Sequence, residues 1–199
     1  MTRVLSLRAL RKSYRSGVPG CSAAVRVLRR ASLDVARGEI VGVAGAPGAG
    51  KSTLLLCAAG LLRPDAGTVE RPCTGTYVAV FPPAYKWMAV LDLISLLIRV
   101  HRPQAVRESL DRVGLGGDLT RPVGTLSSDA LARLHIAYLL VTLPVLALLD
   151  GPISELIGLL PEAGVTVVLA ARDTRAVASI ATRVVVLADG VVAPVPCVG

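Results

Sequence analysis

Apolar residues along the chain form short runs that are separated by glycine, proline and charged residues. Alternating or β-branched runs predict strands, and apolar positions at helical spacing predict helices. The predicted strands cover residues 4–10, 25–35, 40–44, 77–80, 145–149, 165–170 and 183–187, with another after the turn at 63–69. The predicted helices cover residues 54–59, two segments of 90–113 broken at Pro103, 131–141 and about 174–180. This alternation predicts an α/β fold with a mainly parallel sheet covered by helices on both faces.

The segment from Gly45 to Thr53 lies between a predicted strand and a predicted helix, and it reads Gly-Ala-Pro-Gly-Ala-Gly-Lys-Ser-Thr. Glycines let a backbone fold around an anion, so that amide N–H groups and the positive helix end point at it. Lys51 is expected to neutralise the outer phosphates and Ser52 to ligate magnesium. A glycine turn followed by an unrelated lysine is the simpler alternative. The pattern favours a nucleotide-binding P-loop made by Gly45, Pro47, Gly48, Ala49, Gly50, Lys51, Ser52 and Thr53.

Positive charge is concentrated at the start of the chain. Residues 1–37 hold nine lysines and arginines against Asp34 alone, whereas residues 38–199 hold thirteen bases and thirteen acids. Such an excess could attract nucleic acid, anionic lipid or the nucleotide itself, or it could mark the solvated faces of strands. Tyr14 is the one aromatic residue in this segment, so the bases of a nucleic acid would find no stacking platform. No nucleic-acid partner is expected.

The length of 199 residues suits one domain, residues 1–199, because no linker or low-complexity tract divides the chain. The longest uncharged stretch, residues 134–149, contains His135 and Pro144 and is too short to cross a bilayer. Charged residues punctuate the first fifteen positions, so no secretory signal is expected. The four cysteines lack the spacing of metal ligands, which favours reduced thiols in a cytosolic protein.

Asp150 ends a predicted buried strand, where a nucleotide-bound magnesium needs a carboxylate ligand. Leu126-Ser127, Arg133 and the run 146–150 together resemble the signature-to-Walker-B segment of ATP-binding cassette (ABC) proteins. The resemblance spans almost the whole chain. It implies that Tyr14 stacks on adenine, that residues 45–53 are the Walker A loop, that Ser52 and Asp150 hold Mg²⁺, and that Leu126, Ser127, Ser128 and Asp129 form the signature. Asp189-Gly190 matches the turn between late strands of the family.

The resemblance also implies an architecture and partners. The fold would be an ABC-type P-loop NTPase with an N-terminal antiparallel β subdomain and a helical subdomain at approximately residues 82–140. In the family, two nucleotide-binding domains enclose two ATP molecules, and a membrane permease subunit docks beside the glutamine loop. That docking site would lie near Phe81–Met88, where Phe81, Tyr85, Trp87 and Met88 gather. Internal packing between two subdomains is the alternative explanation for these side chains.

Several departures from the family affect the groups that perform hydrolysis. The family's glutamine aligns with Val80, its catalytic glutamate with Gly151 and its switch histidine with Arg172. The signature Leu-Ser-Gly-Gly-Gln reads Leu-Ser-Ser-Asp-Ala at residues 126–130, and Ile157 replaces an aspartate of the dimer-contact loop. Glu155 stands four residues too late to replace the missing base. The nucleotide-holding residues are kept and no catalytic residue is intact.

Two functions therefore follow from the resemblance. The first is the ATP-binding subunit of an ABC transporter, which binds Mg-ATP, couples it to separate permease subunits at the inner face of the cell membrane and pairs with a second ABC nucleotide-binding domain. Hydrolysis is expected to be weak or absent because Gly151 and Arg172 replace the catalytic pair. The alternative is a soluble ATP-binding pseudo-ATPase that acts as a regulator or scaffold.

Overall fold

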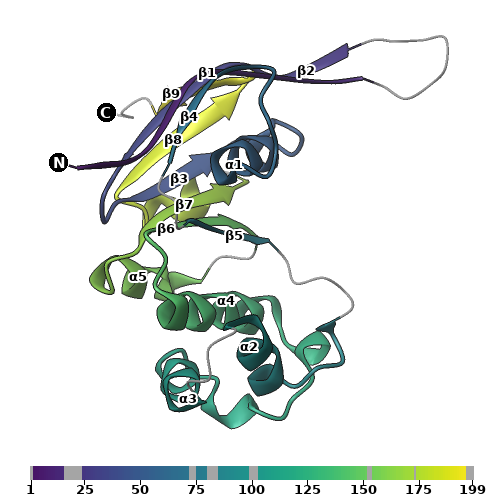
Figure 1. The fold of residues 1–199 in the computed structure, drawn as a ribbon, viewed down its shortest axis with the longest axis vertical. Helices are drawn as coiled ribbons and strands as arrows, with labels where there is room; N and C mark the ends of the chain where they lie inside the picture. The colour runs from purple at the N-terminus through teal and green to yellow at the C-terminus, as the bar shows by residue number, and fades with distance from the viewer. Residues whose placement is uncertain are drawn as a thin grey trace.

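Two β-sheets and a set of helices make up the computed structural model, which describes residues 2–15, 24–71, 75–79, 85–98, 103–151, 154–172 and 174–195 (Figure 1). The antiparallel sheet has the order β2-β1-β4, with β1 at Arg3–Arg15, β2 at Ala24–Ala36 and β4 at Ala66–Glu70. The second sheet has the order β5-β6-β7-β3-β8-β9. Its strands are β3 (Ile40–Ala44), β5 (Gly75–Ala79), β6 (Leu146–Asp150), β7 (Thr166–Ala171), β8 (Arg183–Ala188) and β9 (Val191–Pro194). Every pairing in it is parallel except β8–β9, which confirms the predicted mainly parallel α/β fold.

The α-helices are α1 (Lys51–Ala59), α2 (Val90–Ile98), α3 (Pro103–Arg112), α4 (Ser128–Thr142), α5 (Leu159–Glu162) and α6 (Arg175–Ala178). Among the described residues, 3₁₀ turns include η2 (Gly116–Asp118), η3 (Val123–Thr125) and η4 (Glu155–Gly158). The predicted break at Pro103 is confirmed, since α3 begins on this residue, and proline suits a first helical position. Helix α4 begins three residues before its predicted start because the Ser127 Oγ accepts the Ala130 N–H and caps it. In Figure 1, α2, α3 and α4 gather beyond the β5–β6 side of the parallel sheet.

The parallel sheet is buried on both faces. On β6, Leu146 and Leu148 enter a core that α1 shares with β1 and β2, whereas Ala147 and Leu149 enter a second core with α2, α3 and α4. This explains why these strands read as continuous apolar runs rather than as alternating ones. Among the described residues, Cys57 is a free, buried thiol, and no helix is long and apolar enough to cross a membrane.

Candidate nucleotide-binding site

Three of the sequence-predicted site segments meet at one edge of the parallel sheet. Strands β3, β7 and β6 are neighbours with the same direction, so their carboxyl ends lie together. The P-loop follows β3, Arg172 follows β7 and Asp150 ends β6. The topology thus gathers residues that are more than a hundred positions apart, as expected for a ligand site of an open parallel sheet.

The P-loop backbone has a conformation that requires glycine. Gly48 has a φ of 81° and Gly50 a φ of 100°, in the left-handed region. A Cβ on Gly45 would stand 2.5 Å from the Leu187 carbonyl oxygen, and one on Gly50 would stand 2.6 Å from Val27 Cγ1. Gly50 provides no side-chain cap for α1, and the first turn of α1 carries no acidic residue. The amide groups and the positive end of α1 therefore suit an anion.

Two side chains lie against this loop. The Lys51 Nζ donates to the carbonyl oxygens of Gly45 (2.6 Å) and Ala46 (2.8 Å), which holds the ammonium along the loop. The Tyr14 hydroxyl lies 3.3 Å from the Thr53 Oγ1, so the end of β1 reaches helix α1. Tyr14 is 42% exposed, and its ring is therefore accessible to a nucleobase. The cation and the aromatic ring flank the same loop.

A groove of about 460 Å³ runs along the loop. One wall is β2 with Arg26 and Arg29, and the other comprises the P-loop and residues 186–190. The Arg29 N–H donates to the Gly190 carbonyl at 2.9 Å, which attaches the turn predicted at Asp189-Gly190 to β2. Sequence reasoning did not select these two arginines, although the N-terminal excess of positive charge was the signal that could have identified them.

The residues at the positions where the family would place its catalytic groups lie at and after the end of β6 and after β7. Asp150 is partly buried at the strand end, and Gly151 provides no side chain beside it. Gly151 borders a small cavity that Ile157 also lines, and Ile157 is 1% exposed and belongs to the core. Glu155 is exposed at the start of η4, and Arg172 is exposed after β7. The position of the family's glutamine, Val80, lies outside the described residues, as do Cys21, Cys73 and Cys197.

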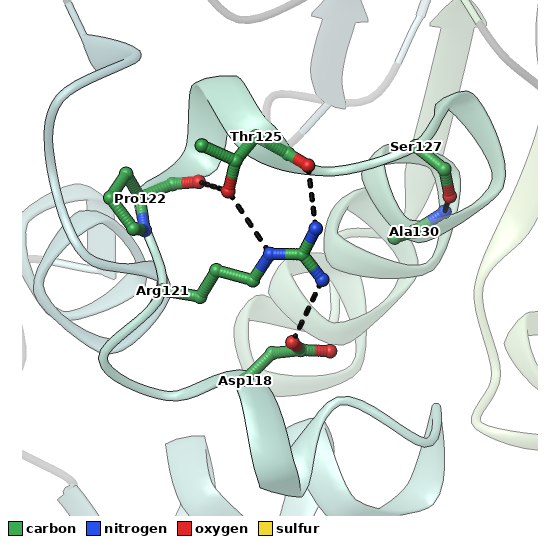
Figure 2. Close-up of polar contacts among 6 residues, drawn as sticks. All are labelled: Asp118, Arg121, Pro122, Thr125, Ser127 and Ala130. Carbon is green, nitrogen blue, oxygen red and sulfur yellow. Dashed lines mark hydrogen bonds and ion pairs between the residues drawn. The ribbon is translucent and has the colours of Figure 1, made fainter.

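Arg121 organises the turn that precedes the predicted signature (Figure 2). Its Nη2 donates to the Thr125 carbonyl at 2.7 Å, its Nε to the Thr125 Oγ1 at 3.0 Å, and its Nη1 to the Asp118 Oδ1 at 3.2 Å. The Thr125 hydroxyl donates in turn to the Pro122 carbonyl at 2.8 Å. One guanidinium thus holds the backbone immediately before Leu126. The sequence did not indicate a role for Arg121, because its hydrogen-bond partners become neighbours only when the turn folds.

The predicted signature residues lie at the N-terminus of α4, with Ser127 as its N-cap. Leu126 is buried, the Ser127 Oγ accepts the Ala130 N–H at 3.1 Å, and Ser128 is exposed. The Asp129 Oδ2 accepts from the Arg133 Nε at 2.6 Å, one helical turn away. The carboxylate that replaces a family glycine is therefore paired on its own helix.

The segment before the signature pairs with the predicted docking segment. The Val123 N–H donates to the Met88 carbonyl at 2.9 Å, and the Gly124 N–H donates to the Lys86 carbonyl at 2.8 Å. Trp87 is 77% exposed, with the Lys86 Nζ 4.7 Å from its ring centroid. Tyr85 and Met88 are partly buried against the helical core, in accordance with the internal-packing alternative for these two residues. Phe81 lies outside the described residues.

Comparisons with known proteins support this description. A family model described as "ABC transporter" matches residues 28–154. The zinc import ATP-binding protein ZnuC of Paramagnetospirillum magneticum is 38% identical over 182 residues, which are 81% of this chain and 68% of that protein. The sulfate/thiosulfate import ATP-binding protein CysA 2 of Chromobacterium violaceum is 35% identical over 195 residues, which are 84% of this chain and 53% of that protein. The chain thus spans about half to two thirds of the length of these curated relatives.

The fold has counterparts among solved structures. A nucleotide-free ATP-binding cassette from an ABC transporter superposes with a TM-score of 0.77 at 20% sequence identity. The match covers 96% of this chain and 90% of the cassette. This likeness confirms the α/β P-loop fold.

Proposed function

Because the chain belongs to the ABC transporter family, we propose that it is the ATP-binding subunit of an ABC transporter, that it binds Mg-ATP, and that it hydrolyses ATP weakly or not at all. The observation that carries the proposal is the P-loop itself, which leads into the uncapped N-terminus of α1 and has Lys51 bonded to its carbonyl groups and Tyr14 beside Thr53. The family relationship supports the choice of ATP, since the relatives described above are named as ATP-binding proteins.

Each group has a specific role in this proposal. Tyr14 would stack on adenine, and the N–H groups of residues 48–53 would hold the phosphates. Lys51 would exchange its two carbonyl acceptors for phosphate oxygens, which are stronger acceptors because they are charged. Ser52 and Asp150 offer a hydroxyl and a carboxylate, the oxygen ligands that Mg²⁺ prefers. The metal would neutralise phosphate charge in the bound nucleotide.

The missing groups argue against efficient hydrolysis. A general base must lie within hydrogen-bond reach of the attacking water. Gly151 has no side chain, and Arg172 is a permanent cation that cannot accept a proton. These substitutions also favour a second candidate, a pseudo-ATPase that regulates or scaffolds a complex through ATP binding.

The proposed partners are a permease subunit and a second nucleotide-binding domain. The exposed Trp87 with Lys86 supports docking at this segment, because tryptophan is enriched among residues that dominate protein interfaces. Such a complex would place the chain at the inner face of the cell membrane.

The test is ATP binding measured by calorimetry in the presence of magnesium. Lys51→Ala should weaken binding about 10- to 100-fold, because a charge-assisted hydrogen bond contributes about 1.5–3 kcal/mol. Arg107→Ala on the exposed side of α3 is the matched control and should leave the affinity unchanged. Equal affinities in the unmodified protein and Lys51→Ala would refute the proposed site. Co-purification with a multi-spanning membrane protein would separate the transporter subunit from the pseudo-ATPase.

A further inference from the structure

A concavity of about 500 Å³ lies at the sheet edge opposite the P-loop. It is bordered by residues 2–6 at the start of β1, Arg37 before β3, Glu70 and Arg71 at the end of β4, and Val145 before β6. Since β3 and β6 run in the same direction, Arg37 and Val145 lie at the end of the sheet that is remote from the nucleotide groove. We call this concavity the arginine pocket.

Positive charge dominates the arginine pocket. Its lining contains Arg3, Arg37 and Arg71 against Glu70. The Arg3 Nε lies 3.5 Å from an oxygen of Asp34, which compensates part of its charge. In the part of the chain that the structure describes, the side chains of Arg37 and Arg71 form neither a hydrogen bond nor an ion pair. The guanidinium groups of Arg37 and Arg71 therefore keep N–H donors that can bind two oxygens of a carboxylate or a phosphate.

Ser6 provides an independent observation. It belongs to the pocket lining and is 2% exposed, and its Oγ has no hydrogen-bond partner among the described residues. Buried hydroxyl groups in folded proteins are almost always hydrogen-bonded, so an unpartnered one needs an explanation. Because the Oγ itself is enclosed, a ligand oxygen would become its partner only when the side chains at the pocket wall move aside.

The Arg71 guanidinium lies beside Gly60. A Cβ at Gly60 would overlap the Arg71 guanidinium, and Gly60 has a φ of 72° as the residue that ends α1. The guanidinium thus lies across the negative end of this helix, a favourable position for a cation. The exposed Arg71 side chain therefore lies where the end of α1 favours a positive charge.

We propose that the arginine pocket binds a phosphate group, either free or carried by a small molecule. Arg37 and Arg71 would each donate to the phosphate oxygens, and the Ser6 hydroxyl would complete the contacts. Phosphate matches the pocket better than a carboxylate does, because its oxygens can accept from two guanidinium groups and a hydroxyl at once. This site is distinct from the nucleotide groove and does not depend on the proposed ATP function.

The experiment measures binding of inorganic phosphate by calorimetry at constant ionic strength. All variants are made in the full chain that already carries Lys51→Ala, so that the P-loop contributes little to the measured phosphate binding. Adding Arg37→Ala and Arg71→Ala should weaken phosphate binding at least about tenfold, whereas adding Arg107→Ala and Arg112→Ala, which removes the same charge from α3, should not. No phosphate binding in the Lys51→Ala chain, or equal weakening by both pairs, would overturn the proposal.

Two further measurements test the contact made by Ser6 and the source of the phosphate. Ser6→Ala should weaken phosphate binding by several fold while the melting temperature stays the same or rises, since the variant removes an unsatisfied hydroxyl. Unchanged phosphate affinity in Ser6→Ala would contradict its role as a contact. Co-sedimentation with phosphatidylglycerol vesicles that depends on Arg37 and Arg71 would identify a lipid headgroup as the source of the phosphate. Phosphate binding without such co-sedimentation would identify a soluble ligand.

Discussion

At the scale of single residues, Tyr14 has two separable features, an accessible ring and a hydroxyl next to the Thr53 Oγ1 at 3.3 Å. If the ring stacks on adenine, Tyr14→Ala should weaken ATP binding about 5- to 100-fold, as stacking on an aromatic ring contributes about 1–3 kcal/mol per base. Tyr14→Phe keeps the ring and should bind ATP almost normally. Calorimetry of both variants with ATP and with inorganic triphosphate would separate base stacking from phosphate contacts. Equal losses in Tyr14→Phe and Tyr14→Ala would assign the effect to the hydroxyl instead.

At the scale of elements, Arg121 holds the turn before the signature by three donated hydrogen bonds, two of them to Thr125. We predict that Arg121→Ala increases amide hydrogen exchange of residues 123–127 by about tenfold or more, because each net hydrogen bond is worth about 1 kcal/mol. Arg121→Lys should restore little of this protection, since an ammonium lacks the planar fork. Arg107→Ala is the control for the lost charge. Unchanged exchange at residues 123–127 would contradict the proposed role of Arg121.

At the junction between β2, β3 and β8, the side chain of Arg183 also connects segments through several hydrogen bonds. The Arg183 Nε donates to the Glu39 Oε1 at 2.8 Å, and its Nη2 donates to the Asp34 carbonyl at 2.7 Å. Although burial opposes ionisation, the hydrogen bonds from Arg183 and from the Ala36 N–H hold the pKa of Glu39 below its ordinary value of 4.5. This stabilisation is therefore fully present above pH 4.5 and is lost as the pH falls below 4.5 and through the lowered pKa.

Glu39→Gln should reveal the contribution of this pair. We expect the free energy of unfolding to fall by about 1 kcal/mol near pH 7, with the difference from the unmodified protein shrinking below pH 4.5. Urea unfolding at a series of pH values measures both quantities. Glu108→Gln, on the exposed side of α3, controls for the general loss of a carboxylate. A difference that stays constant down to pH 3 would show that ionisation of Glu39 does not stabilise the fold.

At the scale of the whole molecule, we expect the chain to bind nucleotide without a complete hydrolytic centre, because Gly151 and Arg172 stand at the expected catalytic positions. We predict essentially no magnesium-dependent ATPase activity from the purified protein. Gly151→Glu combined with Arg172→His should revive hydrolysis only when a second cassette supplies an intact signature, because these changes restore a base and a titratable group. Adding Lys51→Ala to that variant is the control and should abolish the gain. Brisk hydrolysis by the unmodified protein, lost in Lys51→Ala, would contradict the assignment.

If the chain pairs with a second cassette, we expect its altered signature to affect the ATP that is bound by the partner's P-loop. Asp129 would bring a carboxylate towards a partner's ATP, and like charges at about 4 Å repel by about 4 kcal/mol at an effective dielectric of about 20. The Arg133 Nε at 2.6 Å reduces this repulsion by holding the carboxylate on its own helix. Ser128→Gly with Asp129→Gly should therefore increase the partner's ATPase activity in a mixed complex, measured against the same complex with the unmodified signature. A partner activity that does not change would show that Asp129 is already turned away.

The sequence by itself determined the fold class, the P-loop and the family, because these depend on local patterns. Continuous apolar runs indicate strands buried on both faces, and the glycines with Lys51 and Ser52 stand in an order that one strand–loop–helix unit requires. The roles inferred for Tyr14, Asp150 and the signature came from resemblance rather than from geometry, and they remain predictions.

Only the tertiary structure decided which distant residues share a surface. The partners of Arg121, the place of Arg26 and Arg29 beside the P-loop, and the unpartnered hydroxyl of Ser6 depend on how strands pair and turns close. An arginine in a strand has the same local sequence signal whether it faces solvent or a ligand groove, because side-chain direction alternates at every residue and strand order is set by long-range packing. The physical reason is that residues close in the sequence determine a helix or a strand, whereas a binding site requires contacts between helices and strands that are distant in the sequence.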